Sequence, residues 1–176
     1  MTHQLIHTGT HAFDILRYWC GDALNVSGAL EEGLENSKEL KDQGGHAEIE
    51  FDSGATAFIS AYRKKYYIFQ FDLIFENARI MIGNDIQKVY LPGDSQNYQG
   101  FKELFEQSDY TFTSSPHPGM LQDLINAIRN DTQVTCSARN AVEALKIGLA
   151  IFQSHREARR PIAPCDVDPG FVVESV

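Results

Sequence analysis

Apolar positions along the chain change from helical spacing to alternation and back, and this change predicts three groups of elements. Over residues 4–20 the apolar side chains recur three or four positions apart, which is typical of a helix: Phe13, Leu16, Trp19 and Cys20. Gly21 follows directly and is placed to end that helix in a left-handed backbone conformation.

Between residues 24 and 91 the spacing becomes two. Ala47, Ile49 and Phe51 alternate with polar residues, as expected for a strand with one buried face. Asp52-Ser53-Gly54 predicts a tight turn into a partner strand over residues 55–62. Further strands are expected at residues 26–34, 66–75, 79–82 and 88–91, giving five or six. Connections this short imply antiparallel pairing.

Helical spacing returns near the end of the chain. Residues 92–116 read as a loop with one helical turn at 101–105, and a helix follows that ends at 130–131. A second helix is expected from Ala138 to about Arg159, with Ser137 as its N-cap. This order predicts an α+β fold, a predominantly antiparallel open sheet with helices packed on one face, in a single domain over residues 1–176.

Composition narrows the possible partners. The chain has 176 residues and a formal net charge of −9, which argues against general binding to nucleic acid or to an anionic membrane surface. No apolar run approaches the roughly 20 residues of a membrane-spanning helix, and the first residues do not resemble a signal peptide. The three cysteines form no CxxC motif, so a reduced, cytoplasmic protein is expected.

Polar residues along the first predicted helix suggest proton transfer. His3, His7 and His11 are four residues apart, and Asp14 and Tyr18 continue the same stripe. Histidine exchanges a proton near neutral pH, so His7 and His11 form a candidate relay with Asp14 as an orienting carboxylate. The competing interpretation is a set of solvated or capping histidines at the start of the helix.

A metal site is the less favoured interpretation of the same histidines. Along a helix, His3 and His11 are separated by about 12 Å of axial rise, so all three imidazoles cannot reach one ion without unwinding the helix. We therefore expect no metal.

A basic and aromatic segment follows the predicted hairpin. Lys64 and Tyr66 lie in the run Arg63-Lys64-Lys65-Tyr66-Tyr67, which could bind a sugar or an anionic group, although charged residues at a strand end are usually solvated. Neither a Gly-x-Gly-x-x-Gly sequence nor a Walker motif is present. The chain alone is therefore expected to bind no dinucleotide.

Three segments resemble one family of oxidoreductases. Residues 9–14, Gly-Thr-His-Ala-Phe-Asp, resemble the G-x-H-x-x-D helix of the Gfo/Idh/MocA family, which includes glucose–fructose oxidoreductase and inositol dehydrogenase. Residues 49–57 resemble that family's strand–Asn/Asp-x-Gly–strand hairpin, and residues 140–154 resemble its closing helix. The segments occur in the family's order over most of the chain.

The resemblance implies that this sequence is the C-terminal half of a two-part enzyme. Full members join a Rossmann half, which binds NAD or NADP, to an α+β half that shapes the substrate pocket and usually forms the oligomer interface. A Rossmann domain is then an expected partner, and the chain by itself should be inactive. A homo-oligomer through the open sheet face is expected as well.

The resemblance also implies roles for individual residues. His11 matches the catalytic histidine, which would take the hydroxyl proton of a sugar- or polyol-like substrate while hydride leaves for the nicotinamide. His7 stands where polyol-oxidising members commonly carry an aspartate. Asp14 matches a carboxylate that supports the helix. The pocket's other wall would belong to polypeptide outside this sequence.

The alternative function is a non-catalytic, self-associating interaction module. Its open sheet face would carry outward apolar side chains such as Tyr66, Ile68 and Phe71, and the histidines would be incidental.

Overall fold

The computed structural model describes residues 4–31, 44–62, 66–110, 116–171 and 173. These residues form two compact units. Unit 1 comprises Met1–Arg63 with Arg129–Val176, and unit 2 comprises Lys64–Ile128. Each unit is described by itself below.

The first helical segment of unit 1 has two parts. A π-helical stretch, η1 (Gln4–Gly9), leads into α1 (Thr10–Cys20), so the helix predicted over residues 4–20 is confirmed. Gly21 ends α1 with a φ of 88°, and its backbone N–H donates to the Arg17 carbonyl at 2.9 Å. Glycine suits this position because a positive φ is strained for residues with a Cβ atom.

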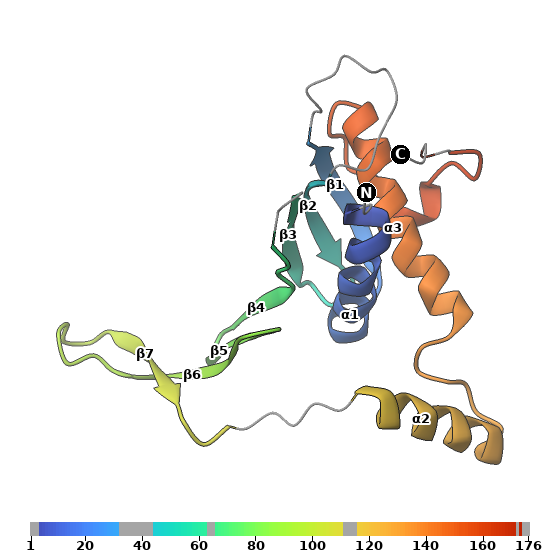
Figure 1. The fold of residues 1–176 in the computed structure, drawn as a ribbon. Helices are drawn as coiled ribbons and strands as arrows, with labels where there is room; N and C mark the ends of the chain where they lie inside the picture. The colour runs from blue at the N-terminus through green and yellow to red at the C-terminus, as the bar shows by residue number, and fades with distance from the viewer. Residues whose placement is uncertain (1–3, 32–43, 63–65, 111–115, 172, 174–176) are drawn as a thin grey trace. The chain divides into compact units, whose positions relative to one another are not determined.

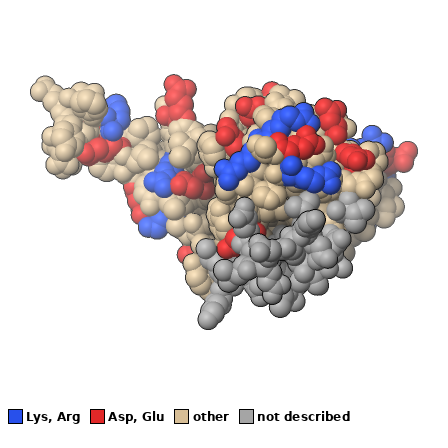
Figure 2. Space-filling view, turned by 90° about the horizontal axis from the view of Figure 1, so that it is seen from above, with Lys and Arg blue, Asp and Glu red and all other residues tan. Residues whose placement is uncertain are grey.

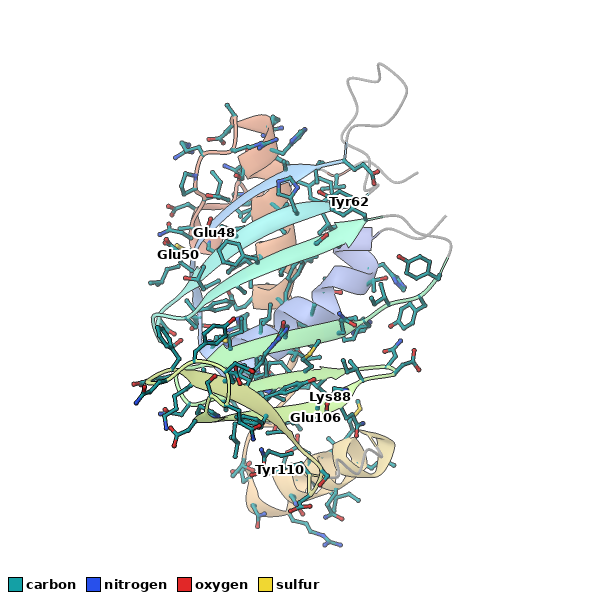
Figure 3. All side chains as sticks on the ribbon, turned by 90° about the vertical axis from the view of Figure 1, so that its left-hand side faces the viewer. Glu48, Glu50, Tyr62, Lys88, Glu106 and Tyr110 are labelled. Carbon is teal, nitrogen blue, oxygen red and sulfur yellow. The ribbon has the colours of Figure 1, made fainter. Side chains whose placement is uncertain are left out.

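A three-stranded antiparallel sheet follows, in the order β1-β2-β3. Its strands are β1 (Ala23–Leu30), β2 (Gly44–Phe51) and β3 (Thr56–Tyr62). The predicted alternation on β2 is confirmed, because Ala47, Ile49 and Phe51 are buried while the residues between them are exposed. Figure 3 shows Glu48 and Glu50 on the exposed face of this sheet, which is turned away from α1 and α3.

Two helices cover the buried face and complete the core of unit 1. Helix α3 (Ala138–Arg156) packs on β1, and α1 packs on α3 (Figure 1). Phe13, Ile49 and Phe152 are fully buried between these layers. Ser137 is the N-cap as predicted, since its hydroxyl accepts a hydrogen bond from the Asn140 N–H at 3.2 Å. The helix ends before Arg159 because Ala158 and Arg159 adopt positive φ angles of 57° and 65°.

The outer edge of β1 is closed by groups from the C-terminal part of the chain. Val26 exchanges two backbone hydrogen bonds of 2.9 Å with Ile162. The Gly28 N–H donates to the buried Ser154 hydroxyl at 3.1 Å, and the Leu30 N–H donates to His155 Nδ1 at 3.3 Å. This edge therefore offers few donors to another strand. A short 3₁₀ helix, η2 (Pro164–Asp166), follows.

Unit 2 contains a four-stranded antiparallel sheet in the order β4-β5-β6-β7. The strands are β4 (Gln70–Phe75), β5 (Ala78–Gly83), β6 (Gln87–Asp94) and β7 (Lys102–Gln107). Side chains that share a face follow from the register of the pairs. One face, named here the apolar face, carries Phe71, Leu73, Ile80, Ile82, Val89, Leu91 and Phe105.

The opposite face of this sheet is mainly polar. There the Arg79 guanidinium binds the Asp72 carboxylate through two hydrogen bonds of 2.8 and 2.7 Å. Lys88 and Glu106 form an ion pair of 2.8 Å (Figure 3). This sheet is therefore amphipathic.

Two predictions for unit 2 are corrected by the structure. The strand predicted at residues 66–75 begins at Gln70. The helical turn predicted at 101–105 is wrong, because Lys102–Gln107 form β7. Phe101, Leu104 and Phe105 have helical spacing, but the pairing with β6 and the Lys102–Asp94 ion pair stabilise the strand instead. Seven strands thus occur among the described residues, which is more than the five or six expected.

The remaining helix, α2 (Pro116–Asn130), ends where the sequence predicts. The α+β class with open antiparallel sheets is confirmed. None of the helices in the described part of the chain is both long and apolar enough to cross a membrane.

Candidate functional site

The two candidate relay histidines lie on the first helical segment of unit 1. His11 is in the first turn of α1, and His7 is in η1; both are exposed. The Thr10 hydroxyl donates to the His7 carbonyl at 2.9 Å, which ties the junction of the two helices. Exposure leaves both imidazoles able to exchange protons with a bound molecule, and their catalytic role stays a prediction.

Asp14 follows His11 by three residues and is half-buried on the same face of α1. The Cys136 thiol lies 3.8 Å from its carboxylate oxygen Oδ2. This contact joins α1 to the segment that precedes α3, a tertiary connection across 122 residues. The proposed support role of Asp14 stays a prediction.

A hollow of about 350 Å³ opens beside Asp14, one helical turn from His11. Asp14, Tyr18 and Trp19 line it from α1, Thr135 and Cys136 line it from the segment that precedes α3, and Asn140 lines it from the first turn of α3. All of these residues belong to unit 1. The hollow therefore does not depend on the placement of unit 2.

Arg17 and Asn140 fix the walls of this hollow. The Arg17 side chain is only 13% exposed; its guanidinium donates to the Asn140 carbonyl at 3.2 Å and pairs with Asp22. The Asn140 side-chain amide donates to the Thr135 carbonyl at 2.8 Å. The positive charge of Arg17 is thus balanced by Asp22, and the two segments are held together by side chains.

The sequence pattern placed Trp19 and Cys20 among the apolar core positions, and the structure corrects this for Trp19. The indole is 42% exposed and faces the hollow, because α1 packs on α3 through Phe13 and Leu16. Cys20 is half-buried, and burial raises the pKa of its thiol. The wall formed by residues 135–140 was missed, since only tertiary folding brings it beside α1.

The predicted substrate-binding residues after the hairpin do not line the hollow in unit 1 as far as the described part of that unit shows. Lys64 lies outside the described residues. Tyr66 belongs to unit 2 and its side chain is 67% exposed. Their role in substrate binding stays a prediction.

The exposed face of the three-stranded sheet carries a second polar pair. His46 Nδ1 and the Tyr62 hydroxyl are 2.8 Å apart. Across the described ranges, no group of three or more His, Cys, Asp or Glu side chains is arranged to hold a metal ion. On the face seen in Figure 2, acidic and basic side chains are interspersed rather than segregated.

A nicotinamide dinucleotide does not fit the residues described here. Such cofactors bind at a glycine-rich turn between a parallel strand and a helix. The named strands all pair antiparallel within the described ranges, and the sequence has no Gly-x-Gly-x-x-Gly turn. The part of the chain that the structure describes therefore contains no dinucleotide-binding turn of this kind.

The fold and the placement of these groups define an α+β domain built on open antiparallel sheets. The sequence matches the "Oxidoreductase family, C-terminal alpha/beta domain" over residues 4–163, so the chain belongs to the C-terminal domains of the Gfo/Idh/MocA oxidoreductase family. A search of curated protein sequences gave no match.

Solved structures show the same fold at low sequence identity. A Desulfitobacterium hafniense protein classed as an NADPH-dependent oxidoreductase gives a TM-score of 0.74 at 16% identity, covering 93% of this chain and 48% of its own. The UDP-N-acetylglucosamine 3-dehydrogenase of Acidithiobacillus ferrooxidans gives 0.67 at 14%, covering 86% and 50%. The WlbA dehydrogenase of Bordetella pertussis, in complex with NADH and UDP-GlcNAcA, gives 0.60 at 17%, covering 90% and 44%. The chain thus spans about half the length of these proteins.

Proposed function

We propose that this chain is the substrate-binding and oligomerisation domain of an NAD(P)-dependent oxidoreductase that acts on a sugar- or polyol-like alcohol. The observation that carries the proposal is an exposed histidine, His11, on the helix of the family's C-terminal domain, one turn from a hollow lined by aromatic and polar residues. Two of the structural relatives are dehydrogenases connected with sugar nucleotides: one is named for UDP-N-acetylglucosamine, and the other has UDP-GlcNAcA bound. We propose a cytoplasmic location as well, as expected for a sequence whose three cysteines form no CxxC motif.

In this proposal His11 acts as a general base. Oxidation of an alcohol removes the hydroxyl proton and a hydride from the same carbon, and the imidazole of His11 takes the proton. His7, one turn earlier, passes that proton on to solvent. The reaction requires a hydride acceptor; the family implies NAD or NADP, held by a Rossmann domain outside the described residues.

Turnover by the longest natural product of the gene tests the role of His11. We expect His11→Asn to lower kcat by about a hundredfold or more, while the circular-dichroism spectrum and Tm stay unchanged because the side chain is exposed. The matched control is His46→Asn, an exposed histidine on the outer face of β2, which should keep full activity. Full turnover by His11→Asn would overturn the proposal.

Calorimetry on the 176-residue chain provides a second test. Neither NAD nor NADH should bind at micromolar concentration, since the glycine-rich turn is missing. Micromolar binding to this chain would show that it carries its own dinucleotide site, contrary to the proposal.

Self-association is the second part of the proposed function, and the apolar face of unit 2 supports it. Leu73, Ile80 and Leu91 on this face are only half-buried, and Phe105 is 39% exposed. A face of this kind is unfavourable in water and is typically covered by a partner. A homo-oligomer would cover it with the same face of a second copy.

Sedimentation velocity tests whether the apolar face of unit 2, rather than the opposite polar face, forms the oligomer contact. We expect Leu73→Asp to dissociate the oligomer, because it places a carboxylate on the apolar face. Ile74→Asp is the control. The Ile74 side chain is 79% exposed and points to the polar face, beside Arg79. A stable wild-type monomer at micromolar concentration would rule out self-association through this face.

A further inference from the structure

The hollow beside α1 combines exposed aromatic rings with polar groups. Tyr18 is 74% exposed and Trp19 is 42% exposed, although both side chains line the hollow. The polar residues Asp14, Thr135 and Asn140 line the same hollow. Small-molecule sites commonly pair an apolar or aromatic lining with a few polar groups that set orientation. This lining is therefore suited to a ligand with both a flat apolar face and hydroxyl groups.

The charges of the hollow favour a neutral ligand over an anion. Asp14 contributes a carboxylate, and the nearby Arg17 guanidinium already pairs with Asp22. No unbalanced positive charge from the lining residues is left for a phosphate, and the chain as a whole carries a net charge of −9. A sugar ring fits this balance, because its hydroxyls can donate to Asp14 while its C–H face stacks on an aromatic ring.

The hollow is aligned with the proposed proton acceptor. His11, Asp14, Ile15 and Tyr18 are spaced three or four residues apart and share one face of α1. Helical rise separates His11 from Tyr18 by about 10 Å along the axis. This distance is longer than one sugar ring, so a molecule bound at both ends must extend beyond the ring that reacts.

We propose that the hollow between α1 and the start of α3 is a second sugar-binding subsite, which takes a neutral ring attached to the sugar that reacts at His11. The inference rests on the proposed function and adds to it the class of substrate: a glycoside or oligosaccharide-like alcohol rather than a single free sugar. Tyr18 and Trp19 supply the stacking surface, and Asp14 accepts hydroxyl hydrogen bonds.

Tryptophan fluorescence tests the subsite directly, because Trp19 is the single tryptophan of the sequence. The 176-residue chain is titrated with glucose, cellobiose, N-acetylglucosamine, diacetylchitobiose and, separately, inorganic phosphate. We expect saturable changes with the neutral sugars, stronger for the disaccharides, and none with phosphate. If none of the four sugars gives a saturable change, or if only phosphate does, the subsite is rejected.

Variants and thiol labelling localise the binding. Tyr18→Ala should weaken sugar binding about tenfold through loss of the stacking surface, whereas Tyr98→Ala, which removes another exposed tyrosine, should leave it unchanged. Bound sugar should slow alkylation of Cys136, which lines the hollow, and not that of the exposed Cys165. Equal alkylation of both cysteines with and without sugar would place the binding elsewhere.

The failure of this inference can be told apart from failure of the proposed function. His11→Asn should retain sugar binding while losing turnover, and Tyr18→Ala should raise KM with little change in kcat. Binding that survives in Tyr18→Ala overturns the subsite alone. Full turnover in His11→Asn overturns the proposed function, and with it the assignment of the bound ring as part of a substrate.

Discussion

Each of the two units contains a sheet with one apolar face, and the two faces differ in how far they are buried. In unit 1 that face is covered by α1 and α3, and Phe13, Ile49 and Phe152 lose all contact with solvent. In unit 2 the apolar face of β4–β7 stays half-buried, and only Val89 and Ala127 are buried apolar residues among those described there. Most of the described hydrophobic core therefore belongs to unit 1.

This difference implies that unit 1 contributes most to folding stability, whereas unit 2 offers the surface for association. Apolar burial contributes about 25 cal/mol for each Å² removed from water. Among the described residues, the covered sheet of unit 1 therefore contributes most to the free energy of unfolding. The half-covered surface of unit 2, together with the exposed apolar side chains Leu121, Leu124 and Ile128 on α2, is the kind of surface that gains most from a partner. Paired substitutions, one in each unit, test this difference.

The largest expected difference concerns phenylalanine. Phe13→Ala in unit 1 should destabilise the fold by about 3–5 kcal/mol, because the ring is fully buried and leaves a cavity. Phe101→Ala in unit 2 removes a ring that is 70% exposed and lies outside the strands of the apolar face, so it should cost less than about 1 kcal/mol. Urea denaturation followed by circular dichroism measures both. Equal losses would mean that the core is not confined to unit 1.

Glycine-to-alanine changes should have opposite signs in the two units. A Cβ atom at Gly28 would lie 2.8 Å from Ile151 Cγ2 and 2.9 Å from the His46 carbonyl, so Gly28→Ala should destabilise by about 1–3 kcal/mol. Gly119, in α2, has no neighbour within 4 Å of such an atom, and alanine there should stabilise the helix by up to about 1 kcal/mol. Denaturation midpoints check the signs; stabilisation by Gly28→Ala would contradict the close packing of α3 on β1.

Serine substitutions test the closed edge of β1. Ser154→Ala removes the hydroxyl that accepts from the Gly28 N–H and leaves a buried donor unsatisfied, so a loss of about 1–3 kcal/mol is expected. Ser60→Ala, at an exposed position on β3, should change the free energy of unfolding by less than about 0.5 kcal/mol. Hydrogen exchange at Gly28 should accelerate only in Ser154→Ala. Unchanged protection in that variant would show that the hydroxyl is not needed.

The smallest effect is expected from the ion pair on the polar face of unit 2. Hydrogen bonds from Arg79 lower the pKa of Asp72 below its ordinary value of 3.8. A lowered pKa stabilises the folded state above the unfolded pKa, and this stabilisation disappears as the pH falls through the folded pKa. Both side chains are more than a third exposed, so solvent weakens the pair. The Tm of Arg79→Gln should lie slightly below that of the wild type at neutral pH and converge with it below the folded pKa of Asp72.

Much of the fold was predictable because local rules govern it. The alternation around Ile49, the Asp52-Ser53-Gly54 turn, the Ser137 cap and the stop at Gly21 each depend on a few neighbouring residues. Strand β7 was not predictable, since Phe101, Leu104 and Phe105 have helical spacing and only pairing with β6 makes the segment extended. Of the site, the polar stripe of His11, Asp14 and Tyr18 could be read from the sequence, while the role of Trp19 could not.

Local sequence patterns were enough to predict the α+β order of elements, the family, and the helix on which His11, Asp14 and Tyr18 share a face, because helix periodicity and turn chemistry act over a few residues. The tertiary structure alone decided that Cys136 and Asn140 lie beside that helix. It also showed that most buried apolar residues of the described ranges belong to unit 1, whereas the apolar face of unit 2 is mainly half-buried. Contacts across more than a hundred residues depend on how the layers pack, and no local pattern records them.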